Sequence, residues 1–145
     1  MPTARRILMH SRRARLAERP LPPPPGAEAP VAAHLAWCVE RCDRGRFDEA
    51  ATALGLLCAD PRANARQRAA AHAALGRGLR FAGHHTEGLA AHAAAVALGR
   101  EAGLDPTRLG MLLHELSVAL DDDGQADKAA VCLAEAMALF AADAG

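Results

Sequence analysis

The sequence predicts an all-α fold in which three antiparallel helical hairpins stack in a row. A similar phrase of six residues occurs three times, beginning at Gly45, Gly83 and Gly124, so the repeats start 38 and 41 residues apart. A period of about 40 residues is typical of stacked helical pairs. Apolar residues make up 51% of the chain, and most of them are alanine and leucine, which favour helix. The 145 residues suffice for one domain with a modest core.

The N-terminal part differs from the rest in charge and in proline content. Residues 1–19 have a net charge of +5, because six arginines face the single acid Glu18: Arg5, Arg6, Arg12, Arg13, Arg15 and Arg19. Residues 20–30 hold six prolines and cannot form the interior of a helix or strand. We therefore expect residues 1–29 to be a basic, proline-rich, flexible arm that ends in a polyproline II spacer. The folded domain should then cover residues 30–145.

Start and stop signals divide the domain into six helices. Pro30 suits the first turn of the first helix, and Asp60-Pro61 ends the second. Gly103 is a C-cap candidate for the fourth, and Asp105-Pro106 supplies an N-cap followed by proline for the fifth. The expected pairs are residues 31–44 with 48–59, 66–82 with 86–101, and 107–123 with 126–142.

Small and apolar residues recur at matching positions of the three pairs. The second pair has them at Ala74, Leu75, Gly76, Leu79, Gly83, Leu89, Ala90, Ala91 and Ala95, with Glu87 among them. The third has Leu116, Ser117, Leu120, Gly124, Ala129, Leu133 and Ala136, and the first has Trp37, Cys38, Gly45, Phe47, Ala50, Leu54 and Leu57. Over residues 31–142 this pattern resembles the tetratricopeptide repeat (TPR) family, in a long-period bacterial variety. The small residues at Cys38, Gly76 and Ser117 let the two helices of a pair approach closely.

The resemblance implies a right-handed α-solenoid whose inner helices line a concave face. It also implies a non-catalytic adaptor or chaperone-like module that binds a peptide or protein on that face. The groove residues implied are Val39, Cys42, Asp43, Arg77, Arg80, Phe81, His114, Val118, Asp121 and Asp122. Arg77 and Arg80 lie three residues apart on one helical face, where they could bind a carboxylate or an acidic stretch or else remain solvated.

The last predicted helix is apolar on more than one face. Its large apolar residues are Val131, Leu133, Met137, Leu139 and Phe140. Repeat arrays usually end in a polar cap, and a helix with two apolar faces favours burial on both sides. We therefore expect Val131, Leu133, Met137 and Phe140 to form a self-association or capping surface, which a second copy, the N-terminal segment or a partner would cover. A homodimer through this helix is one such arrangement.

Three consecutive acids, Asp121, Asp122 and Asp123, end the fifth predicted helix. They oppose the helix macrodipole and repel each other. One interpretation is a dock for a basic partner, including the arginine-rich arm of the same or a neighbouring chain. The other is a solvated turn whose cost is tolerated.

No motif in the sequence indicates catalysis, a cofactor or a bound metal. His34, Cys38 and Cys42 share one helical stripe, but a fourth ligand at a recognisable spacing is missing. No phosphate loop or nucleophile elbow is present, and no apolar run is long enough for a membrane helix.

The four cysteines indicate a cytoplasmic protein in which they remain reduced. An alternative function is a regulator that contacts nucleic acid through the arginine-rich arm. Against it, no recognition fold surrounds the arm, and the domain itself is neutral to acidic.

Overall fold

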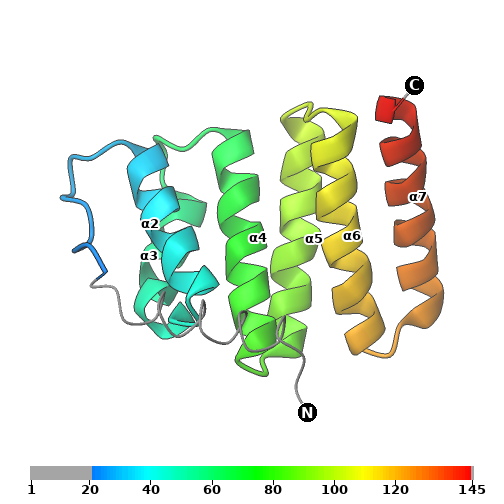
Figure 1. Ribbon diagram of the computed structural model, residues 1–145, viewed down its shortest axis with the longest axis horizontal. Helices are drawn as coiled ribbons and strands as arrows, with labels where there is room; N and C mark the ends of the chain where they lie inside the picture. Colours follow the sequence, from blue (N-terminus) through cyan, green and yellow to red (C-terminus); the bar gives the residue numbers. More distant parts are fainter. Residues whose placement is uncertain (1–20, 145) are drawn as a thin grey trace, which may run out of the picture.

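The computed structural model describes residues 21–144, in which six α-helices form a row of three pairs (Figure 1). The helices are α2 (Val31–Asp43), α3 (Phe47–Ala59), α4 (Ala65–Phe81), α5 (His85–Glu101), α6 (Pro106–Asp122) and α7 (Ala126–Ala144). No strand occurs between residues 21 and 144. The all-α prediction is therefore confirmed, and every predicted helix boundary lies within two residues of the observed one.

Glycine in the left-handed region ends the first helix of each pair. Gly45, Gly83 and Gly124 have φ values of 72°, 89° and 77°, which other residues rarely adopt. The next backbone N–H then turns back onto the helix, as in the 2.8 Å bond from His84 N–H to the Leu79 carbonyl. This is the Schellman arrangement, in which the chain leaves one helix and enters the next. The repeated phrase is thus the turn of each helical pair.

Side-chain caps fix the start of α4 and α6. The Asp105 carboxylate accepts from the Arg108 N–H at 3.2 Å, and Pro106 follows as the first helical residue, as predicted. Asn64 accepts from the Gln67 N–H at 2.8 Å, while the Gln67 side chain accepts from the Asn64 N–H at 3.1 Å. This reciprocal capping box satisfies two backbone groups at once, and it explains why α4 begins at Ala65.

The helices contact one another in a regular order. Within pairs, α2 packs on α3, α4 on α5, and α6 on α7, and consecutive pairs are joined through α3–α4 and α5–α6. The first helices of the pairs also touch, α2 with α4 and α4 with α6. Figure 1 shows α2 and α3 at one end of the row and α7 at the other. The first helices therefore form one side of the molecule.

The core is built mainly from small residues. Ala50, Leu54, Ala74 and Cys38 are buried between the first two pairs, and Leu113 and Ala136 are buried in the third. A Cβ at Gly76 would lie 2.8 Å from the His92 ring, so the missing side chain is what lets α4 and α5 lie this close. The small residue expected there has the predicted packing role.

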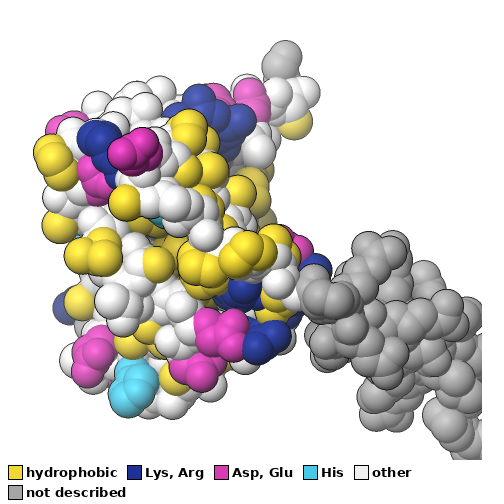
Figure 2. Space-filling view, turned by 90° about the vertical axis from the view of Figure 1, so that its left-hand side faces the viewer, with side chains coloured by type: hydrophobic (Ala, Val, Ile, Leu, Met, Phe, Trp, Pro, Cys, Tyr) yellow, Lys and Arg dark blue, Asp and Glu magenta, His cyan; other side chains and the backbone are white. Residues whose placement is uncertain are grey.

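The proline-rich segment lies against α2 where the structure describes it. The Pro22 carbonyl accepts from Trp37 Nε1 at 3.1 Å and from the Arg41 guanidinium at 2.6 Å. The Arg41 guanidinium also stacks 4.5 Å from the Trp37 ring centroid. Hydrophobic side chains, prolines included, spread across this end of the molecule (Figure 2). The segment therefore covers α2, whereas residues 1–20 of the predicted arm lie outside the described residues.

None of the helices between residues 21 and 144 combines the length and the apolar character needed to cross a membrane.

Candidate functional site

A pocket of about 440 Å³ opens where the first pair of helices meets the second. The end of α2 and the following turn form one side, the start of α3 forms the floor, and the end of α4 forms the other side. The lining residues are Cys42, Asp43, Gly45, Phe47, Asp48, Arg77, Gly78, Phe81 and Ala82. We call this cavity the α2–α4 pocket. Its apolar floor and charged rim are the usual combination in a binding site.

Two phenylalanines give the α2–α4 pocket its apolar character. The Phe47 ring packs directly on Gly78, where any side chain would collide with it. Phe81 stands at the rim and is 85% exposed. A large apolar side chain that is this exposed next to an apolar hollow is a common feature of protein-binding surfaces.

The two arginines predicted for the groove form ion pairs with α6. Arg77 donates to both carboxylate oxygens of Glu115, at 2.8 and 3.0 Å. Arg80 lies 3.7 Å from the Asp122 carboxylate. These pairs connect α4 to α6, so the charge of each arginine is already balanced within the chain.

The acids of the α2–α4 pocket have a different environment. Asp43 and Asp48 are exposed, and neither has an ion-pair partner in the described part of the chain. Arg77 contributes a positive charge to the rim, but Glu115 neutralises it. The α2–α4 pocket is therefore apolar inside and acidic at its edge.

The structure places eight of the ten predicted groove residues in three separate hollows. Cys42, Asp43, Arg77 and Phe81 meet in the α2–α4 pocket. Val39 lies with Asp43 along an open hollow of about 480 Å³ between α2 and α4. The residues from α6 that line a third hollow, against α7, are His114, Val118 and Asp121. Arg80 and Asp122 pair with each other outside these hollows.

Five residues that line the α2–α4 pocket were not predicted as site residues: Gly45, Phe47, Asp48, Gly78 and Ala82. Phe47 and Asp48 belong to the repeated turn phrase, and their position after Gly45 was a usable signal that they face the next pair. Gly78 gave no signal, because its role depends on the ring of Phe47 from another helix.

The cysteines and the buried histidine have shifted pKa values that disfavour their reactive forms. Burial raises the pKa of the Cys38 thiol to about 11, and it also raises the pKa of Cys42. Burial, assisted by Arg80 and Arg77, lowers the pKa of His92 to about 4. Near neutral pH the thiols are therefore protonated and the imidazole is uncharged.

The residues predicted to form a self-association or capping surface differ in their exposure. Val131 and Met137 are 69% and 62% exposed, and Leu133 is 39% exposed. Phe140 instead packs against Gly110 of α6, and it belongs to the interior of the third pair.

Among residues 21–144, no three histidine, cysteine or acidic side chains lie together in a way that would hold a metal ion. Comparisons of the chain with protein-family models, curated proteins and solved structures found no match.

Proposed function

We propose that this chain is a non-catalytic protein-interaction module that binds a peptide segment in the α2–α4 pocket. The observation that carries the proposal is Phe81, which is 85% exposed at the rim of a cavity with an apolar floor. Exposing a phenylalanine to water is unfavourable, and a partner that covered it would bury apolar area worth about 25 cal/mol per Å². Aromatic residues in such positions commonly carry much of the binding energy.

The pattern of contacts between the helices supports a TPR-like solenoid as the scaffold. Each pair touches only its neighbours, and the first helices α2, α4 and α6 touch in sequence. Stacks of this kind leave a surface along their first helices that a partner can occupy. Asp43 and Arg77, which the TPR resemblance implies for the concave face, both line the α2–α4 pocket. The four free cysteines agree with a role in the cytoplasm.

The charges around the α2–α4 pocket define the kind of peptide that fits. Glu115 and Asp122 already neutralise Arg77 and Arg80, so an acidic stretch gains little there. Asp43 and Asp48 lack such partners within residues 21–144 and would attract a cation. We therefore assign the site to a segment with one bulky apolar residue flanked by lysine or arginine, in place of the acidic segment that the sequence suggested.

A peptide-display selection on the immobilised full chain tests this assignment. We expect enrichment of peptides with a leucine or aromatic anchor next to basic residues. Phe81→Glu and Asp43→Lys should each weaken the binding of a selected peptide at least tenfold in fluorescence anisotropy. Leu56→Glu is the matched control, because Leu56 is 69% exposed on α3 and does not line the pocket.

Two outcomes would contradict the proposal. Selected peptides that bind Phe81→Glu as tightly as the wild type would move the site elsewhere. Enrichment of acidic anchors would show that Arg77 and Arg80, and not Asp43 and Asp48, determine the preference for charge.

A further inference from the structure

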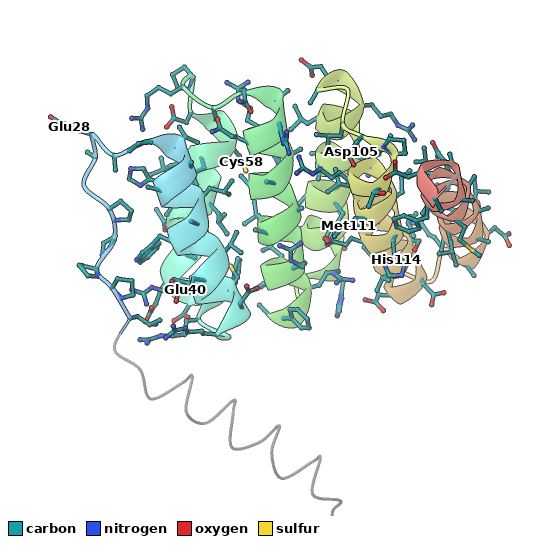
Figure 3. The ribbon with its side chains drawn as sticks, turned by 45° about the horizontal axis from the view of Figure 1, so that its top comes forward. Glu28, Glu40, Cys58, Asp105, Met111 and His114 are labelled. Atoms are coloured by element: carbon teal, nitrogen blue, oxygen red, sulfur yellow. The ribbon has the colours of Figure 1, made fainter. Side chains whose placement is uncertain are left out.

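The C-terminal end of the row has an open groove between α6 and α7. It contains a hollow of about 320 Å³ lined by parts of both helices, among them His114, Val118 and Leu133. Met111 and His114 lie one turn apart on α6 (Figure 3). Together with Asp121 on α6 and Ala130 and Met137 on α7, these residues are called the end face below.

The same positions in the preceding pair are covered by a helix. The turn glycines Gly83 and Gly124 are 41 residues apart, and this offset matches Leu133 to His92 and Met137 to Val96. His92 and Val96 are 1% and 6% exposed, whereas Leu133 and Met137 are 39% and 62% exposed. Position by position, the end face has the shape of a surface onto which a first helix packs.

The helix that covers the preceding pair is α6. It inserts Leu109 and Leu112 against Gly99 of α5, and its Glu115 carboxylate lies 3.6 Å from Nδ1 of His92. No described residue occupies the corresponding place on the end face. The row therefore ends with a vacant site for one more helix, parallel to α6.

The charges of the end face are opposite to those of the preceding pair. In the preceding pair, Arg77 and Arg80 of α4 form ion pairs with Glu115 and Asp122 of α6. The offset places Asp121 where α4 has Arg80. Asp123 and Asp127 lie close by, around the turn between α6 and α7, and both are exposed. A helix that packed here would need apolar residues first and basic residues last, when read in the direction of α6.

We propose that the end face binds the N-terminal segment, residues 1–20, of a second copy of this chain. The segment has its apolar residues early, at Ile7, Leu8 and Met9, and four of its arginines later. Laid parallel to α6, Leu8 would face His114 and Val118, and Arg15 would face Asp121. A helix of 20 residues is about 30 Å long, which is similar to the length of α6 and α7.

The segment must come from another copy because of where it starts. Residue 20 precedes Leu21, and the Pro22 carbonyl is held by Trp37 and Arg41 of α2. Helix α2 lies at the opposite end of the row from α7 (Figure 1). Adjacent helices pack about 8–10 Å apart, so several helix widths separate Pro22 from the end face of its own chain. One residue cannot span that gap.

Such a contact joins the end face of one copy to the N-terminal segment of another. The resulting dimer still has one free end face and one free segment. Head-to-tail contacts of this type continue into open chains unless their rotation closes a ring. A parallel contact between two identical end faces would instead bring Asp121, Asp123 and Asp127 of both copies together, which their charges disfavour. The charge pattern thus favours the basic segment over a parallel dimer of end faces.

Two half-blocked variants of the full chain test the proposal. Leu133→Arg with Asp121→Arg blocks the end face, and Arg12→Glu with Arg15→Glu blocks the segment. In sedimentation velocity at low salt, the wild type should gain mass with concentration, and each variant alone should stay at the mass of one chain. A mixture of the two variants retains one intact surface of each kind, and should form a dimer of one chain of each variant.

The controls and the contrary outcomes are equally specific. Leu56→Arg, which changes an exposed leucine of α3, should assemble as the wild type does. A wild type that stays at one chain at all concentrations would overturn the proposal. A dimer that survives in the segment-blocked variant would show that the end face pairs with itself. Failure of the two blocked variants to combine would likewise exclude the head-to-tail contact, provided that their circular dichroism shows both to be folded.

Discussion

Gly78 is the residue on which the floor of the α2–α4 pocket depends. Because it has no side chain, the Phe47 ring can cross from α3 and lie on the backbone of α4. Gly78→Ala should therefore displace the ring, lower the free energy of unfolding by about 1–3 kcal/mol and weaken binding of a selected peptide. Urea unfolding and fluorescence anisotropy measure the two effects.

Gly55 provides the matched control for this substitution. It is also a helical glycine, but a Cβ placed on it would meet nothing within 4 Å. Gly55→Ala should stabilise the protein by about 0.5–1 kcal/mol, because alanine loses less backbone entropy in a helix. If both substitutions had the same effect, the contact between Phe47 and Gly78 would have no particular importance.

His92 makes stability depend on pH. Burial is the main reason why its pKa falls to about 4, and Arg80 and Arg77 add to the shift. In the unfolded chain the imidazole titrates near its usual value of about 6.5. Between these values the unfolded state binds a proton that the folded state lacks, so stability is fully present above about pH 6.5 and is lost as the pH falls toward 4. The loss should reach roughly 3 kcal/mol at most.

Urea unfolding across this pH range checks the prediction. His92→Gln cannot titrate, and its unfolding free energy should fall less steeply between pH 6.5 and 4 than that of the wild type. His84→Gln, which changes an exposed histidine in the α4–α5 turn, serves as the control variant. An equal slope in all three proteins would mean that other groups determine the acid sensitivity.

At the level of single helices, α4 depends on its capping box. Asn64 and Gln67 exchange hydrogen bonds that satisfy two backbone N–H groups at the exposed start of the helix. Asn64→Ala should lower the free energy of unfolding by about 1 kcal/mol, whereas Asn64→Asp should nearly preserve it. Thermal unfolding followed by circular dichroism distinguishes the two, and equal melting temperatures for both variants would show that the cap is unimportant.

The helices could be predicted from local chemistry, whereas the pocket could not. Gly45, Asp105 and Pro106 act through their own backbone conformation or their nearest neighbours, so the sequence displays their role directly. The pairing of Arg77 with Glu115 joins residues from two different helical pairs. Arg77 and Phe81, which the sequence led us to expect on the concave face, both line the pocket. It could not show that Arg77 is already neutralised, because that depends on how α6 is rotated about its axis.

For the molecule as a whole, contacts limited to neighbouring helices make stability uneven along the row. Helix α7 packs mainly on α6 and reaches α5 through the ion pair of Glu135 with Arg100. It buries two residues, Ala129 and Ala136, whereas α4 and α5 each bury six. Elements with few buried contacts open at low free-energy cost. Hydrogen exchange at low protein concentration should therefore be faster in α7 than in α4 or α5. Protection of α7 equal to that of α4 would contradict this gradient.

Trp37 gives the molecule an intrinsic optical reporter. The chain has one tryptophan and no tyrosine, so its tryptophan fluorescence comes from this one ring. The indole N–H donates to the Pro22 carbonyl, and the Arg41 guanidinium stacks on the ring. Any event that pulled the proline-rich segment away from α2 would break the first contact and expose the indole to water. The emission wavelength and the quenching of Trp37 would then show, without any added label, whether the proline-rich segment is in contact with α2.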